Sequence, residues 1–405
     1  MEVSEILTTL ERLRVAAALG QHTLVSELQE RLADSVRHIS SLGQAAVSAG
    51  HGRWQAVLDA AGGLDAVQPG VARFASLLHA EALLELGRTE GCLDAARELL
   101  GKDPDDHAAR VLAGRALFRL RRLDQAEPEL RRAVQGAPQN AEAHFGLGLV
   151  LMAKGELPQA LALLRQAQRL NPVDEGPYRA MARLFRMTGQ VVEGADRIGG
   201  LLRGQLVSGP GLLLDLAELE LLAGRPERLP AMLHTLEEHG ALEPLHLLEL
   251  ARLWCELDDS QAVQRLADRA QGLEHRLAAG VHTELRALLA ELVGDGETAR
   301  QLHGQACTQL PGHWLPHTRA ALLYLYRPDE RSIRAAGAHL AQAVKLAPRT
   351  PDVRLLVAIL QVARGDYSVR PSLAMVAQHP GMRPSLRRLA ESTLATVDAR
   401  EQGEA

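Results

Sequence analysis

Histidine, cysteine and carboxylate side chains can bind metal ions or transfer protons, and their spacing decides whether they are able to act together. Pairs among the sixteen histidines that lie close in sequence include His234 and His239, His275 and His282, and His313 and His317. Only the last pair has the four-residue spacing of one helix face, and Pro316 between its members disfavours a regular helix there. We therefore expect no metal site and no cofactor.

The sequence lacks the patterns that mark common catalytic sites. It has no phosphate-binding GxxxxGK loop, no GxSxG nucleophile turn and no HExxH zinc motif. The carboxylate pairs Glu237-Glu238 and Asp258-Asp259 fall at expected helix ends or turns, where solvation explains them most simply. The cysteines, Cys92, Cys255 and Cys307, form no CxxC pair, which favours reduced thiols on helices. We expect a chain that is not an enzyme, with no catalytic residue.

Prolines recur at a fixed interval in the first half of the chain. Pro104, Pro138 and Pro172 are each 34 residues apart. The same phase is kept by Gly114 and Gly148, Ala126 and Ala160, Leu130 and Leu164, and Ala133 and Ala167. A fixed period of this length indicates a repeat architecture, in which stacked units bury one another's apolar faces. The aromatic content of 3% argues against β-sandwiches and barrels, whereas abundant Leu and Ala suit closely packed helices.

The clearest unit runs from Ala141 to Pro172, and it resembles the tetratricopeptide repeat (TPR) family. The resemblance rests on Leu147-Gly148, the turn glycine Gly155, Ala160, Leu164, Ala167 and Pro172. His144 and Leu151 stand where the family usually has aromatic residues. The resemblance implies an all-α, right-handed solenoid of stacked antiparallel helix pairs. In such a unit, Gly148 and Ala160 allow close approach where the helices cross, and Gly155 takes the turn.

The same phase predicts further, more divergent units on both sides. Their turns are expected at Gly87, Gly189, Gly224, Gly294 and Gly365, with Asp258-Asp259 in place of glycine in one unit. We divide the chain into N-terminal helices with one divergent repeat (1–72), a basic array (73–208), an acidic, divergent array (209–380), and a capping helix with a tail (381–405). Residues 107–208 hold 15 basic and 9 acidic side chains, residues 209–310 hold 8 and 17, and the break is placed at Ser208–Gly211.

By the resemblance, the first helix of each unit lines a concave surface. The predicted partner-binding residues there are Arg115, Phe118, Arg119, Phe145, Leu149, Met152, Arg179, Arg183 and Arg186. Arg179, Arg183 and Arg186 are spaced i, i+4, i+7 and share one helix face. Arginine stripes beside an apolar, Met-containing floor suit a short acidic-hydrophobic peptide. Solvated arginines, or salt bridges within the array, are the alternative.

The ends and the charge of the chain bear on its location. Net charge is −5, which gives no reason to expect nucleic acid as a partner. Glu2, Glu5 and Glu11 precede only a short apolar stretch, and no window reaches roughly 18 uninterrupted apolar residues. We therefore expect no signal peptide, no membrane insertion and a cytoplasmic location.

The function that fits these features is a protein-protein interaction scaffold or adaptor that binds a partner protein or peptide in its concave groove, as a subunit of a larger assembly. The charge split favours a second contact surface or head-to-tail association into a homo-oligomer. A peptide-sensing regulatory receptor is one alternative, although residues 1–60 show no basic recognition helix. An accessory TPR subunit of an enzyme such as a transferase is another, although the repeats leave no block of roughly 150 residues for a catalytic fold.

Overall fold

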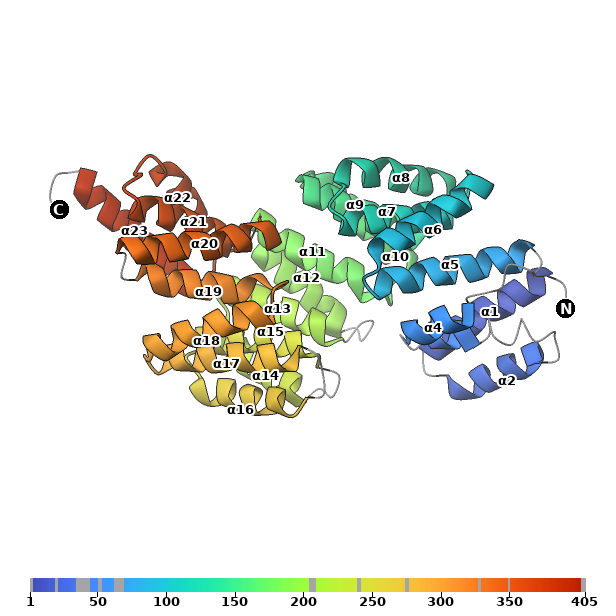
Figure 1. Cartoon of the computed structure of the whole chain (residues 1–405), viewed down its shortest axis with the longest axis horizontal. Coiled ribbons are helices and arrows are strands. Elements are labelled where there is room, and N and C mark those ends of the chain that lie inside the picture. Colours follow the sequence, from blue (N-terminus) through green and yellow to red (C-terminus); the bar gives the residue numbers. More distant parts are fainter. Residues whose placement is uncertain are drawn as a thin grey trace. The chain divides into compact units, whose positions relative to one another are not determined.

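The computed structural model describes residues 3–18, 21–33, 44–49, 53–61, 69–203, 209–238, 242–273, 277–326, 329–348 and 350–401. Within these ranges every regular element is a helix and no strand occurs, which confirms the predicted all-α fold. The helices form two compact units, Met1–Pro172 and Val173–Ala405, and each is a stack of antiparallel helix pairs (Figure 1). None of the described helices combines the length and the apolar character that a membrane crossing requires.

The first unit ends with three helix pairs that follow the predicted repeat. Each of these helices packs against its neighbours in sequence order. The helices of this unit are α1 (Val3–Ala18), α2 (His22–Ala33), α4 (Trp54–Ala61), α5 (Pro69–Glu85), α6 (Thr89–Lys102), α7 (His107–Arg119), α8 (Leu123–Gly136), α9 (Ala141–Lys154) and α10 (Leu157–Leu170).

The second unit continues the pairs and closes on a final long helix. Its helices are α11 (Glu175–Thr188), α12 (Val191–Arg203), α13 (Pro210–Leu222), the 3-10 turn η1 (Pro226–Arg228), α14 (Leu229–Glu238), α15 (Pro244–Glu256), α16 (Ser260–Gln271), α17 (Ala278–Leu292), α18 (Gly296–Gln309), α19 (Trp314–Leu325), α20 (Glu330–Leu346), α21 (Pro351–Ala363), α22 (Arg370–Ala377) and α23 (Pro384–Glu401). Helix α23 occupies the place predicted for the capping helix, whereas α19 begins three residues before the predicted repeat start at His317.

The turns inside the hairpins carry the backbone conformation that the repeat requires. All six predicted turn glycines have positive φ: Gly87 (77°), Gly155 (90°), Gly189 (76°), Gly224 (76°), Gly294 (81°) and Gly365 (85°). Asp258, predicted to replace a glycine, has φ 58°, and Arg121 takes the same conformation with φ 62°. Side chains with a Cβ are strained in this region, so these two turns depart from the optimum.

Small residues set the distance between paired helices. A Cβ added at Gly114 would lie 2.4 Å from Cγ of Leu130, and one at Gly148 would lie 3.0 Å from Cδ2 of Leu164. Ala160 is fully buried at the same crossing. The predicted close approach of the helices is therefore confirmed, and the phase of the repeat with it.

The four-part division of the chain stays a prediction. The two compact units meet between Pro172 and Val173, and the predicted change of charge lies further along the chain. Ser208, at the predicted break, lies outside the described residues, as do the last four residues of the predicted tail.

Candidate functional site

Six of the nine predicted binding residues lie in the first unit, on the first helices of two successive hairpins. Phe118 on α7, and Phe145, Leu149 and Met152 on α9, are half-buried, whereas Leu151 beside them is 1% exposed. The predicted apolar floor thus keeps part of its surface outside the core of the unit. Apolar surface of this kind is available to anchor a partner side chain.

The two arginines of this unit are held by a shared carboxylate. Nη2 of Arg115 lies 2.9 Å from Oε1 of Glu85 on α5, and Nη2 of Arg119 lies 3.1 Å from the same oxygen. Arg119 also donates to the carbonyl of Leu84, and Nη1 of Arg115 lies 3.6 Å from Oε2 of Glu142. Salt bridges within the array were the alternative to partner-binding arginines, and these pairs are such salt bridges. Their side chains nevertheless remain 28% and 40% exposed.

A hollow of about 120 Å³ lies beside these pairs in the first unit. Nη2 of Arg14 on α1 lies 2.7 Å from Oε1 of Glu81 on α5 at its rim, and burial raises the pKa of Glu81 in spite of Arg14. The sequence did not indicate this pair, because its members are 67 residues apart and α1 precedes the clear repeats. The hollow is lined by Glu11, Arg14, Phe74, Leu77, Leu78, Glu81, Ala108, Val111, Leu112, Asn140 and Glu142.

The other three predicted residues, Arg179, Arg183 and Arg186, lie on α11 in the second unit. Nε of Arg179 donates to Oδ2 of Asp215 at 2.9 Å, and Arg186 pairs with Glu218, both acceptors being on α13. Burial raises the pKa of Asp215 to about 6, although Arg179 opposes the shift. Of the three, Arg183 alone is exposed. Two of the predicted arginines therefore join neighbouring hairpins.

The C-terminal segment His379–Arg387, here called the clasp, folds back onto the beginning of the second unit. It joins residues up to 192 positions apart in the chain. Its contacts reach α11, α13 and α15 in turn: His379 Nε2 to the carbonyl oxygen of Met187, 2.9 Å; Arg383 Nη2 to Oε1 of Glu218, 2.6 Å; and Ser385 Oγ to Oε1 of Glu256, 2.6 Å. The first helices of three successive hairpins are thus occupied by the chain itself.

Glu218 is the centre of a buried ionic network. It accepts from Arg186 and Arg383, and its side chain is only 16% exposed. Nη2 of Arg252 lies 3.3 Å from Oδ2 of Asp352 nearby. Burial favours a higher pKa for Glu218, but Arg186, Arg383 and Arg252 together hold it well below its usual range. Burial, together with repulsion from Arg383, lowers the pKa of Arg252 to about 10.

A cavity of about 200 Å³ lies against this network in the second unit. Its charged lining is internally paired: Nε of Arg319 lies 3.0 Å from Oε1 of Glu291, and Arg252, Asp352 and Arg383 belong to the network above. Its apolar lining includes Cys255, Tyr326 and the leucines Leu288, Leu292, Leu315, Leu322, Leu356, Leu386 and Leu389. Because charges of both signs are already matched, the cavity does not select a ligand of one charge.

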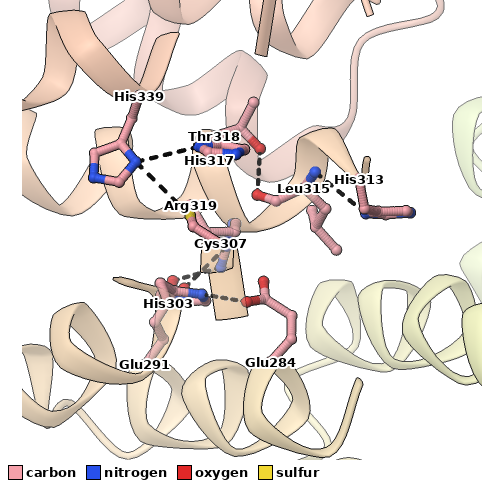
Figure 2. Close-up of polar contacts among 10 residues, drawn as sticks. All are labelled: Glu284, Glu291, His303, Cys307, His313, Leu315, His317, Thr318, Arg319 and His339. Carbon is pink, nitrogen blue, oxygen red and sulfur yellow. Dashed lines mark hydrogen bonds and ion pairs between the residues drawn. The ribbon is translucent and has the colours of Figure 1, made fainter. Parts of the chain in front are cut away.

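A buried histidine joins two carboxylates, one of which, Glu291, also lines the cavity (Figure 2). Nδ1 of His303 lies 2.8 Å from Oε2 of Glu284, and its Nε2 lies 2.6 Å from Oε1 of Glu291. Burial lowers the pKa of His303, but the two carboxylates overcome it and raise the pKa to about 9. The imidazolium therefore donates to both carboxylates at neutral pH, and it ties α18 to α17.

Three potential metal-ligand atoms meet near the C-terminal end of α18. They belong to Cys307 on α18, His317 on α19 and His339 on α20, and all lie within 4.8 Å of one another (Figure 2). The sequence gave no signal for this group, because its members lie on three helices with spacings of no recognised motif. His313, paired with His317 in the sequence, instead accepts from the backbone N–H of Leu315 and caps α19.

Comparisons with known proteins identify the repeats. A profile of the tetratricopeptide repeat family matches residues 77–141 and 113–175, and no curated protein matches the sequence. Among solved structures, a chain of the APC/C hetero-tetramer Cut9–Hcn1 is similar at 15% identity over 84% of this chain and 59% of that chain, with a TM-score of 0.47. Yeast Tom70 is 12% identical over 98% and 96%, with a TM-score of 0.46. The thermophilic TPR protein TTC0263 of Thermus thermophilus is 22% identical over 45% and 99%, with a TM-score of 0.40.

The matched residues have the helix pairs, buried small residues and turns of the repeat. They include the helix pairs from α5 to α10, the buried Ala126 and Ala160, and the turn glycines Gly87 and Gly155. The chain spans 59% of the Cut9–Hcn1 chain that it matches. The profile match and this geometry identify residues 77–175 of the chain as tetratricopeptide repeats.

Proposed function

We propose that this chain is a non-catalytic interaction scaffold that binds a partner protein or peptide through the first helices of its first unit. The observation that carries the proposal is the half-buried floor of Phe118, Phe145, Leu149 and Met152 on α7 and α9. In a repeat array, such helices form extended surfaces that bind other chains. Because a floor of this kind needs an apolar anchor, the partner is expected to contribute a large apolar side chain.

The charges beside the floor add a second requirement for the partner. Arg115 and Arg119 are oriented by Glu85 but keep exposed surface, so a carboxylate of the partner can approach them from the side away from Glu85. Arginine forks favour carboxylate oxygens. An acidic-hydrophobic segment therefore remains the best-fitting partner. In the second unit, Arg183 is the exposed arginine of the predicted stripe.

The clasp supports the proposal by analogy within the chain. A short segment, His379–Arg387, lies on the first helices of the second unit and is held by an arginine–carboxylate network. The same kind of surface in the first unit has an apolar floor and paired arginines. A segment of another protein would complete it in a comparable way.

The proposal is tested with peptides selected on the full chain from a display library. Their affinities are then compared between Leu149→Ala/Met152→Ala and Leu163→Ala, a half-buried control on the second helix α10. Arg119→Glu is compared with Arg132→Glu, an exposed control on α8. We expect the floor and Arg119 variants to weaken binding by about tenfold or more, and the controls to leave it unchanged. Equal binding by variant and control would place the contact elsewhere and refute the assignment.

A further inference from the structure

A thiol and two imidazoles converge where two repeat hairpins meet. Cys307 lies near the C-terminal end of α18, His317 lies in the first turns of α19, and His339 lies in the middle of α20 (Figure 2). Each side chain therefore comes from a separate helix of a packed array. Within the described residues this is the one group of three or more His, Cys, Asp or Glu side chains whose ligand atoms come this close together.

The distances within this thiol–imidazole cluster match those between ligands of one ion. Nδ1 of His317 lies 3.4 Å from Nδ1 of His339, and Sγ of Cys307 lies 3.8 Å from the same nitrogen. A tetrahedral Zn²⁺ has Zn–N distances of about 2.0–2.1 Å and a Zn–S distance of about 2.3 Å, which separates its ligands by about 3.3–3.4 Å (N to N) and about 3.5–3.6 Å (N to S). These two separations lie within a few tenths of an ångström of these values, and the ligand atoms of the third pair, Cys307 and His317, lie within 4.8 Å of each other.

Direct hydrogen bonds explain the cluster less well. An N–H···N bond is normally close to 3.0 Å long, so the 3.4 Å between the two Nδ1 atoms is long for one. A thiol is a weak donor, and 3.8 Å lies near the outer limit for a contact with sulfur. The two imidazole nitrogens thus face one another and the thiol at a spacing that leaves room for an ion between them.

The surroundings of the cluster hold it in place and suit a cation. The ring of Tyr324 stacks on His339, with centroids 6.0 Å apart and an interplanar angle of 20°, which fixes the orientation of the imidazole. Oε1 of the buried Glu284 has no hydrogen-bond partner among the described residues, and the charge of this carboxylate acts on Cys307. Cys307 is 8% exposed and both histidines are half-buried, so an ion can enter from solvent.

We propose that Cys307, His317 and His339 bind one Zn²⁺ ion, with the fourth position taken by water or by an incoming ligand. On binding, the Cys307 thiol gives its proton to solvent and becomes a thiolate, while the imidazoles bind as neutral ligands. The ion would join α18 of one hairpin to α19 and α20 of the next. It would therefore pin the junction between two repeats in the second unit.

The test uses the full chain, freed of metal with a chelator and then titrated with Zn²⁺ against a chromophoric competitor. We expect one ion per chain, and an affinity at least about tenfold weaker in Cys307→Ser and in His339→Gln. Cys255→Ser and His234→Gln, which change a thiol and an exposed imidazole elsewhere in the unit, serve as matched controls and are expected to bind normally. No stoichiometric uptake, or equal loss in variants and controls, would overturn the proposal.

A spectroscopic measurement keeps the proposal testable if a ligand variant fails to fold, as judged by far-UV circular dichroism. Co²⁺ substituted for Zn²⁺ in the unaltered chain is expected to show tetrahedral d–d bands and a thiolate-to-cobalt charge-transfer band. The charge-transfer band must persist in Cys255→Ser. Bound cobalt without that band, or a band that disappears in Cys255→Ser, would assign the ion to other side chains and refute the cluster.

Discussion

Replacement of Glu218 by glutamine is expected to loosen the clasp. Glu218 accepts from Arg186 of α11 and from Arg383 of the clasp, so it is the carboxylate that both cations share. Glutamine keeps the shape of the side chain but removes its charge. Arg186 and Arg383 then remain close together, with Asp352 at 4.0 Å as the nearest anion to Arg383. The repulsion between the two guanidinium groups is no longer balanced.

The size of the effect follows from the burial of the three groups. The side chains of Glu218 and Arg383 are 16% and 8% exposed, and that of Arg186 is 24% exposed. Removing one partner of a buried ion pair costs about 3–5 kcal/mol, because the remaining charge stays buried without compensation. Since Arg186 retains some contact with solvent, the lower end of the range applies, about 3 kcal/mol. That corresponds to roughly a hundredfold change in the opening equilibrium of the clasp.

Hydrogen exchange measures this opening directly. The amide of Met382 donates to the carbonyl of His379, and that of Arg387 donates to the carbonyl of Arg383, so peptides covering 379–387 report on the clasp. We expect their exchange to accelerate by roughly a hundredfold in Glu218→Gln. Glu193→Gln on α12 is the control, because Glu193 forms an exposed pair with Arg197 that contributes less than about 0.5 kcal/mol.

Two results would refute this reasoning. Equal exchange of the clasp in Glu218→Gln and Glu193→Gln would mean that the network does not hold the segment. A double-mutant cycle with Arg383→Met gives the second test. If the effects of Glu218→Gln and Arg383→Met simply add, the two side chains are not coupled in solution.

Three further predictions concern the repeats and one buried histidine. Ala160→Trp is expected to overpack the crossing with Gly148 and to lower the free energy of unfolding by about 1–3 kcal/mol or more, and an unchanged urea midpoint would mean that the crossing is not tightly packed. Arg121→Gly is expected to raise the melting temperature, because it relieves a positive φ of 62°, whereas Gly155→Ala, at φ 90°, should lower it. The pKa of His303 is raised to about 9 from an ordinary 6.5, so the stability from its charge is fully present below about pH 6.5 and is lost as pH rises through about 9. The loss amounts to about 3 kcal/mol. This loss of stability at high pH should be absent in His303→Gln. If the stability of His303→Gln depended on pH in the same way as that of the unaltered chain, the prediction would be contradicted.

The sequence predicts the hairpins because their requirements are local. A turn that needs positive φ selects glycine, and all six glycines chosen for that reason have it. A close helix crossing selects Gly and Ala, as at Gly148 and Ala160. The role of each such position can be predicted from its own residue type, without knowledge of the rest of the fold. Helices α13, α15 and α21 begin at Pro210, Pro244 and Pro351, where the fixed φ of proline suits the first turn.

The roles of the arginines on α11 are harder to predict from the sequence, because the carboxylates that pair with them lie one repeat away. Arg179 pairs with Asp215 and Arg186 with Glu218, over separations of 36 and 32 residues, close to the repeat period. Arg115 and Glu85 are 30 residues apart. A search for opposite charges one period away would have indicated these bridges. No such rule applies to the clasp, whose contacts join residues 129 to 192 positions apart and depend on how the whole second unit packs.

The ion pairs of the two units differ in burial, and this difference indicates what each set of charges does. Buried ion pairs contribute little net stability, because desolvation of the charges offsets their attraction. The network around Glu218 is therefore better understood as a device that sets the position of the clasp. A shift of the clasp by one residue would move the buried guanidinium of Arg383 away from Glu218, whereas an apolar contact tolerates such a shift. In the first unit the corresponding pairs with Glu85 are partly exposed and lie beside an apolar floor that is half-buried. The same arrangement of first helices thus fixes a segment of the chain in one unit, and in the other it leaves half-buried apolar surface, on which we propose that a partner binds.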